Sequence, residues 1–146
     1  MATSTAYPLT TKRIVIGQVI VCSGCCCGAV QRGKPEVPVD WLKQTWRSQG
    51  LLKNVQLTIS CCLGPCDLPN VVRISSSAKD TWLGNITRLE QYALLVDWAV
   101  QSKAAGAFLP LPQSLDGLRF DPFSEPLPAK LPGPCRSEVR LVRMEN

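Results

Sequence analysis

Two short cysteine-rich segments constrain the fold of this chain more than any other feature. Seven of its eight cysteines lie in these segments, the first at residues 22–28 and the second at residues 61–67. Each segment follows a run rich in Val and Ile, at residues 14–21 and 55–59, and such runs are typical of buried strands. We therefore expect the two segments to leave the ends of two strands, where one fold can bring them together.

The residue types available favour metal chemistry over disulfide bonding. Residues 1–11 have no basic region followed by an apolar core, so they do not indicate a secretory signal. In a reducing cytosol, clustered cysteines bind metals or carry out redox chemistry. The chain contains no histidine, which excludes Rieske-type clusters and imidazole-containing zinc sites. Thiolates remain as ligands for a soft metal, which favours an iron–sulfur cluster or four-thiolate zinc.

The cysteine spacing predicts two ligand pairs. Four residues separate the members of the first pair and three separate those of the second. A 2Fe–2S cluster needs four thiolates, two for each iron, and glycine-containing loops allow backbone N–H groups to approach its sulfurs. The predicted ligands are Cys22, Cys27, Cys62 and Cys66. Three other thiols remain open as replacements for a predicted ligand, namely Cys25, Cys26 and Cys61.

Hydrophobic periodicity predicts an α/β domain with the element order β-α-β-β-β-α. The first five elements are predicted at residues 12–21, 39–50, 54–60, 71–75 and 81–83. The first two strands should be parallel, with their carboxyl ends on one edge. We predict that Asn85 caps the second helix and that this helix ends between Ala104 and Ala107. Its sheet-facing side chains are predicted to be Leu89, Ala93, Val96 and Val100.

Composition divides the chain into three predicted parts. Residues 1–11 form a mobile N-terminal tail, residues 12–103 form the cysteine-bearing domain, and residues 104–146 form a Pro-rich extension that is partly disordered. Seven of the twelve prolines fall between Pro110 and Pro134. Each proline removes a backbone donor and fixes φ, so this density favours an extended segment over a packed one.

Several motifs resemble those of thioredoxin-like 2Fe–2S ferredoxins. The likeness covers roughly residues 12–102 and is carried by Cys22–Gly28, Pro35–Leu42, Cys62–Asp67 and Trp82–Gly84. These segments are similar to those of small bacterial ferredoxin-domain proteins, some of which are linked with cobalamin synthesis. The cysteine pairs also resemble those of the small iron–sulfur subunit of NADH:quinone oxidoreductase, which favours Cys27 over Cys25 and Cys26. Cys61 departs from the pattern, because glycine is expected there.

The resemblance implies a soluble, cytoplasmic one-electron carrier with a thioredoxin-like fold and a single 2Fe–2S cluster. Such a carrier would exchange electrons with a redox protein in cobalamin or tetrapyrrole metabolism, and it is compatible with a homodimer. We expect no nucleic-acid partner, since no nucleic-acid motif is present, and no membrane span, since no apolar run is long enough. No phosphate loop, dinucleotide fingerprint or catalytic base indicates an enzyme.

The charge distribution leaves two interpretations open. Residues 1–103 carry eleven Lys or Arg against six Asp or Glu, which accounts for the net charge of +5. This excess is either an ordinary solvated surface or a docking face for an acidic redox partner, with Arg32, Lys34 and Arg47 as candidates near the cluster.

Three alternatives for the cysteines also remain. They are a four-thiolate zinc site in a metal-handling accessory module, a thiol oxidoreductase that uses Cys22 and Cys25, and buried thiols with a purely structural role.

Overall fold

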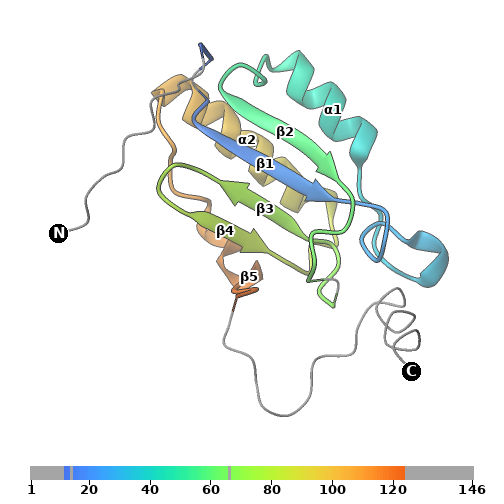
Figure 1. The fold of residues 1–146 in the computed structure, drawn as a ribbon. Helices are drawn as coiled ribbons and strands as arrows, with labels where there is room; N and C mark the ends of the chain where they lie inside the picture. Colours follow the sequence, from blue (N-terminus) through green and yellow to red (C-terminus); the bar gives the residue numbers. More distant parts are fainter. Residues whose placement is uncertain (1–11, 14, 66, 124–146) are drawn as a thin grey trace.

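The fold is built on one mixed five-stranded sheet. The structure is a computed structural model that describes residues 12–13, 15–65 and 67–123. The strands are β1 (Gly17–Cys22), β2 (Val55–Ser60), β3 (Val72–Ser75), β4 (Asp80–Leu83) and β5 (Arg119–Phe120). Their order across the sheet is β2-β1-β3-β4-β5, with β1 and β2 parallel and the other neighbours antiparallel (Figure 1). The predicted α/β class and the parallel pairing of the first two strands are confirmed.

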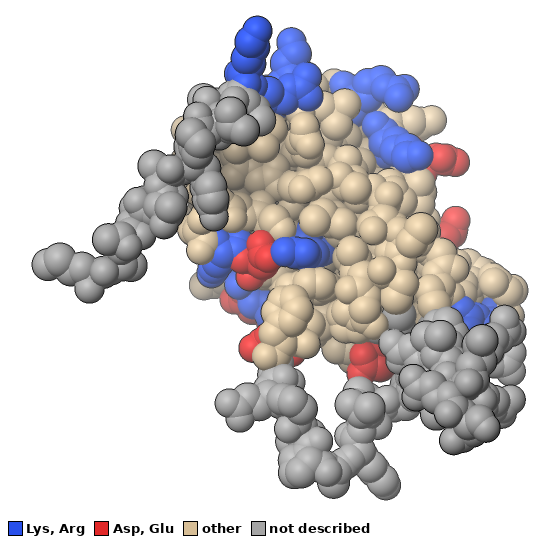
Figure 2. Space-filling model, in the orientation of Figure 1, with Lys and Arg blue, Asp and Glu red and all other residues tan. Residues whose placement is uncertain are grey.

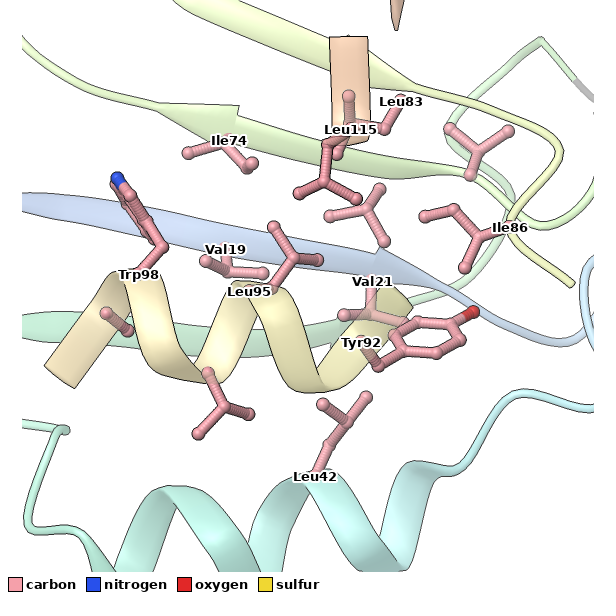
Figure 3. Packing of buried hydrophobic residues seen from close by; sticks show 14 of the residues in the cluster. Val19, Val21, Leu42, Ile74, Leu83, Ile86, Tyr92, Leu95, Trp98 and Leu115 are labelled. Carbon is pink, nitrogen blue, oxygen red and sulfur yellow. The ribbon is translucent and has the colours of Figure 1, made fainter. Parts of the chain in front are cut away.

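Two helices pack against the sheet. They are α1 (Val39–Ser48) and α2 (Leu89–Ala105), and they contact each other and β2. Along β1, Val19 and Val21 are buried, whereas Gln18 and Ile20, which alternate with them, are only partly covered. Figure 3 shows Leu42 of α1 on the same side of the sheet as the α2 side chains. The helices therefore cover one face of the sheet, and the other face is left more open.

Helix α1 follows the prediction closely. Pro38 is its N-cap, and the chain turns at Gly50, where φ is 62°. Leu42 and Trp46, spaced four residues apart, are each 1 % exposed. The Trp46 indole N–H donates a hydrogen bond to the Val55 carbonyl oxygen at 2.7 Å, which joins the helix to the start of β2. This link fixes the orientation of α1 beside the parallel strands.

Helix α2 differs from its prediction in its start and in its buried face. Asn85 adopts φ of 55°, outside the helix, and the N-cap is Arg88. The Gln91 Oε1 atom accepts hydrogen bonds from the backbone N–H groups of Thr87 and Arg88, which satisfies donors that a helix start leaves free. The predicted cap was wrong because Gln91 places the start three residues later.

The predicted inner face of α2 was wrong for most of its members. Leu89 is 49 % exposed, and Ala93 and Val100 are only partly buried, so Val96 alone of the predicted side chains is buried. The buried side chains of α2 are Tyr92, Leu95, Val96, Trp98, Ala99 and Ser102. In Figure 3 the labelled α2 side chains Tyr92, Leu95 and Trp98 lie on the side of the helix that faces β1 and β3.

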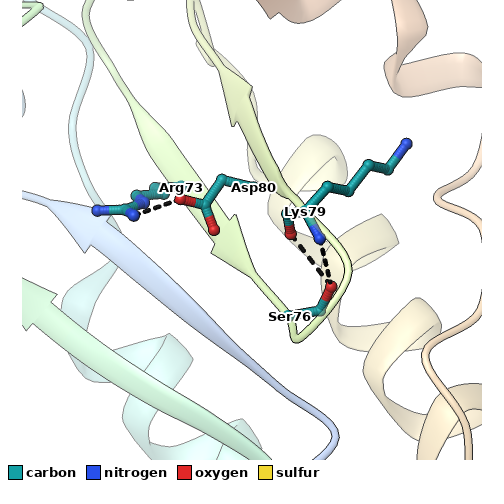
Figure 4. Close-up of polar contacts among 4 residues, drawn as sticks. All are labelled: Arg73, Ser76, Lys79 and Asp80. Atoms are coloured by element: carbon teal, nitrogen blue, oxygen red, sulfur yellow. Dashed lines mark hydrogen bonds and ion pairs between the residues drawn. The ribbon is translucent and has the colours of Figure 1, made fainter. Parts of the chain in front are cut away.

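The predicted β3–β4 hairpin is confirmed. Ser75 pairs with Asp80 across the turn, and the Ser76 hydroxyl accepts the Lys79 N–H and donates to the Lys79 carbonyl (Figure 4). Arg73 forms an ion pair with Asp80, and its guanidinium lies 5.3 Å from the centre of the Trp82 ring. Because both members of the ion pair are about one-third exposed, the pair adds at most about 1 kcal/mol.

The packed domain extends beyond its predicted boundary at Lys103. Helix α2 runs to Ala105, a 3₁₀ helix spans Gln113–Leu118, and β5 then pairs with β4. Within this segment Leu111 is 7 % exposed and Leu115 is fully buried. Prolines thus join short elements here and do not prevent packing, since an extended chain can still place Leu side chains against a sheet.

Two predictions lie outside the described residues. The mobile tail at residues 1–11 and the Pro-rich extension beyond residue 123 are not described by the structure. In the part of the chain that is described, no helix combines the length and the apolar character needed to cross a membrane.

Candidate cysteine metal centre

The two cysteine segments begin side by side at one edge of the sheet. Cys22, the last residue of β1, pairs in register with Ser60, the last residue of β2. The Ser23 N–H donates to the Ser60 carbonyl at 2.9 Å, so the chains are still joined where both strands end. Parallel strands place their carboxyl ends at one edge, and the structure confirms the predicted meeting of the two segments. We call this edge the cysteine edge.

The first segment holds two buried thiols together. Cys22 is 2 % exposed and Cys27 is fully buried, and their thiols are hydrogen-bonded to each other. That hydrogen bond, with burial as a second cause, raises the pKa of the Cys22 thiol far above its ordinary range. Gly24, with φ of 123°, lets the chain reverse so that its N–H donates to the Cys27 carbonyl at 3.0 Å.

Backbone N–H groups point at the sulfur atoms of three predicted ligands. The Val71 N–H donates to Cys27 Sγ at 3.3 Å, and the Gly64 N–H donates to Cys62 Sγ at 3.4 Å. A backbone hydrogen bond from Leu63 reaches the Cys22 thiol and acts to lower its pKa. Such donors stabilise thiolates, so the first segment and the loop after β2 already provide what anionic sulfur requires.

The other thiols differ in exposure and bonding. The Cys61 and Cys62 side chains are both exposed, and Cys25 is partly buried. Cys26 is 6 % exposed and is disulfide-bonded, so in this oxidation state it offers no thiolate. The predicted preference for Cys27 over Cys26 is consistent with this difference, but exposure does not separate Cys61 from Cys62. The fourth predicted ligand, Cys66, lies outside the described residues.

The described thiols do not form a complete metal centre by themselves. In residues 12–13, 15–65 and 67–123, no three side chains of His, Cys, Asp or Glu come close enough to hold one metal ion together. The structure therefore brings together the pair Cys22 and Cys27, and it places Cys62 on the neighbouring loop at the cysteine edge.

Asn70 joins the loops around the site. It is fully buried, and its Oδ1 accepts the Gly28 N–H at 2.9 Å. Its Nδ2 donates to the carbonyl oxygens of Pro35 and Glu36, at 3.0 and 3.1 Å. One side chain thus fixes the end of the first cysteine segment to the loop before α1.

The sequence analysis missed Asn70, because nothing in its local pattern distinguishes it from an ordinary loop asparagine. Only its position a few residues after the second cysteine segment gives a signal.

Tyr92 closes the site from the helix side. It is 1 % exposed and lies beside Asn70, close enough for the Cys22 and Cys27 thiolates to act on it. Burial raises the pKa of Tyr92 above its ordinary value, against an opposing effect of the Asn70 side chain and with smaller contributions from Cys27 and Cys22, so the phenol stays protonated. Its buried Oη forms no hydrogen bond with any residue that the structure describes. The sequence analysis missed this residue because it assigned α2 a different inner face.

Two groups of positive charges lie at opposite ends of the parallel strands. We call residues 23–38, which join β1 to α1, the first cysteine loop. Arg32 ends a short 3₁₀ helix in this loop, Val30–Arg32, and its guanidinium donates to the Cys25 carbonyl. Lys34 follows in the same loop. Arg47 is in the last turn of α1 and borders a hollow of about 340 Å³ with Lys53 and Lys103. Figure 2 shows Lys and Arg gathered over this end, at α1 and the amino ends of the strands. The prediction that Arg47 lies near the cysteines was wrong.

Two comparisons with known proteins were without a match. No protein-family model matches this chain, and no curated protein does. Its function has to be inferred from the site described above.

Proposed function

We propose that this protein is a one-electron carrier that holds a single 2Fe–2S cluster on Cys22, Cys27, Cys62 and Cys66. The observation that carries the proposal is the set of backbone donors on three of these sulfurs, from Leu63, Gly64 and Val71. An oxidised cluster with four thiolates has a charge of about −2, which is costly near a protein interior without such donors. The buried phenol of Tyr92, whose Oη forms no hydrogen bond with the described residues, could donate a further hydrogen bond to a sulfur.

The topology supports a thioredoxin-like ferredoxin domain. A parallel β1–β2 pair is followed by an antiparallel β3–β4 hairpin, and both helices contact the sheet at β2 or each other. This arrangement puts two loops at one edge of the sheet, as a cluster bound by two cysteine pairs requires. The cluster would supply the redox chemistry, while the protein supplies thiolates, donors and partial burial.

The proposed partner is a redox protein with an acidic face near the cysteine edge. Arg32 and Lys34 lie in the first cysteine loop and form no ion pair with the residues that the structure describes. They would attract such a partner to the side where electron transfer over a short distance is possible.

The structure disfavours a dithiol oxidoreductase based on Cys22. A nucleophilic cysteine needs exposure and a lowered pKa, whereas Cys22 is 2 % exposed and its pKa is raised. Its neighbour in space is Cys27, so the Cys22–Cys25 pair that this activity would use is not favoured.

Anaerobic purification tests the proposal. We expect a brown protein with about two iron and about two sulfide per chain, whose visible absorption bleaches with dithionite. A colourless protein that binds one zinc per chain would support the four-thiolate zinc alternative instead. Insulin reduction without any metal would support the thiol oxidoreductase.

A further inference from the structure

The buried hydroxyl of Tyr92 is a donor without an acceptor. Tyr92 lies in the first turn of α2 and is 1 % exposed, so water does not reach its side chain freely. Its Oη forms no hydrogen bond with the described residues. Buried hydroxyl groups are nearly always paired, because an unpaired polar group loses its hydration without compensation. An acceptor is therefore expected that the residues described by the structure do not provide.

The direction of the side chain shows where that acceptor would be. In Figure 3 the Tyr92 hydroxyl points toward the end of β1, where the first cysteine segment begins. Cys22 and Cys27 act on Tyr92 electrostatically, and among the described residues they are the thiols that do so. The hydroxyl thus faces the buried ligand pair from the helix side of the sheet.

Asn70, the nearest polar neighbour, is already occupied. Its Oδ1 accepts the N–H of Gly28, and its Nδ2 donates to Pro35 and Glu36. Both hydrogens of the amide nitrogen are therefore used. The Asn70 side chain acts on Tyr92 to lower the pKa of the phenol, which is the effect of a donor that faces the phenol oxygen, and the hydroxyl hydrogen of Tyr92 has no acceptor among the described residues.

We propose that Tyr92 donates a hydrogen bond from Oη to a sulfur of the group held by Cys22 and Cys27, and that this bond raises the reduction potential of that group. The proposal rests on the proposed 2Fe–2S function. Adding an electron makes the sulfurs more negative and better acceptors, so the hydrogen bond stabilises the reduced state more than the oxidised state. Tyr92 is then a tuning residue and not a ligand.

The substitution Tyr92→Phe tests this proposal because it removes one oxygen and keeps the ring in the core. We expect a midpoint potential shifted to a more negative value, with iron and sulfide content near that of the parent. Electron–nuclear double resonance of the reduced parent in H₂O and D₂O should show one strongly coupled exchangeable proton that Tyr92→Phe lacks. If the variant folds poorly, ¹³C labelling of tyrosine at Cζ in the parent assigns the coupling, because the chain has one other tyrosine, Tyr7, and the absence of a tyrosine ¹³C coupling would overturn the proposal.

Ser102→Ala is the matched control. Ser102 is also on α2, ten residues after Tyr92, and its hydroxyl is fully buried. That hydroxyl accepts a hydrogen bond from the Leu109 N–H at 3.3 Å. Removing it should leave the potential and the proton couplings unchanged. The proposal is overturned if Tyr92→Phe has the parent's potential and couplings, or if Ser102→Ala shifts the potential equally.

A zinc-loaded protein separates failure of this proposal from failure of the proposed function. If the chain binds zinc and no iron, the electron-carrier proposal fails, and the Tyr92 hydroxyl can be followed by proton magnetic resonance. A slowly exchanging hydroxyl signal that disappears in Tyr92→Phe would support donation to a thiolate sulfur. Fast exchange of that proton, or a chain that binds neither metal, would overturn the Tyr92 proposal as well.

Discussion

At the residue scale, Asn70 is the side chain on which the shape of the site depends most. It makes three hydrogen bonds, to Gly28, Pro35 and Glu36, and none of these groups is near it in sequence. Gly28, whose N–H Asn70 accepts, directly follows Cys27 in the chain. Val71 directly follows Asn70, and its N–H donates to Cys27 Sγ. The same short segment therefore sets both the position of the Cys27 thiol and its donor.

Asn70→Asp should destabilise the domain while changing little in volume. The new carboxylate can still accept the Gly28 N–H, but it cannot donate to the carbonyl oxygens of Pro35 and Glu36 when ionised. Two carbonyl oxygens lose their donor and a carboxylate replaces a fully buried amide, which predicts a loss of about 2–5 kcal/mol in the free energy of unfolding. Urea unfolding followed by circular dichroism measures this difference.

Asn85→Asp provides the control for that measurement, because Asn85 is exposed. Its effect should stay within about 0.5 kcal/mol. Equal effects of the two substitutions would show that the hydrogen bonds of Asn70 do not hold the loops together.

The cysteines of the site could be predicted from the sequence because their chemistry is distinctive. The roles of Asn70 and Tyr92 could not, because these roles depend on what lies beside them in the fold. The pairing of Cys22 with Cys27 follows from spacing and from the strand before them, and the structure brings their thiols together. Asn70 and Tyr92 act through partners more than twenty residues away or on another element. Such roles depend on tertiary packing, which leaves no local pattern in the chain.

At the element scale, the strands and α1 could be predicted, but the start of α2 and the segment after it could not. The strands are rich in the β-branched residues Val, Ile and Thr, which favour the extended conformation and so predict strands from the sequence. The start of α2 is set by Gln91, whose side chain accepts hydrogen bonds from two backbone N–H groups. Asn85 is a residue type that often caps helices, but here it adopts a left-handed conformation before the helix begins. Proline density then hid β5, because short extended pieces tolerate proline at their ends.

The segment after α2 should contribute to stability, which Leu115→Ala measures. Leu115 is fully buried in the cluster that includes Ile74 and Leu83. Removing its side chain leaves a cavity, and we expect a loss of about 2–5 kcal/mol in the free energy of unfolding. Leu52→Ala is the control, since Leu52 is 46 % exposed and should cost less than about 1 kcal/mol. A Leu115→Ala protein as stable as the parent would mean that residues 104–123 do not belong to the folded unit.

At the scale of the whole molecule, the two basic regions predict which end meets the redox partner. Charge reversal of Arg32 and Lys34 together should slow reduction by an acidic donor such as flavodoxin by about tenfold at low ionic strength. Rising salt should reduce the parent's rate and narrow this difference, because exposed charges are screened. Stopped-flow reduction at several salt concentrations checks both effects.

Reversal of Arg47 and Lys53 is the matched control at the far end of the molecule, where these two side chains border the same hollow. Its rate should stay near that of the parent. A larger effect from this pair than from Arg32 and Lys34 would place the docking face at the amino ends of the strands.

The central claim is tested most directly by iron and sulfide analysis with electron paramagnetic resonance of the dithionite-reduced protein, for the parent and for single Cys→Ser variants. The account predicts about two iron and two sulfide in the parent, with a signal from one reduced 2Fe–2S cluster. It predicts loss of cluster in the Ser variants of Cys22, Cys27, Cys62 and Cys66, and near-parent content in those of Cys25, Cys26 and Cys61. A parent that binds no iron, or a Cys66→Ser protein with full cluster content, would contradict it.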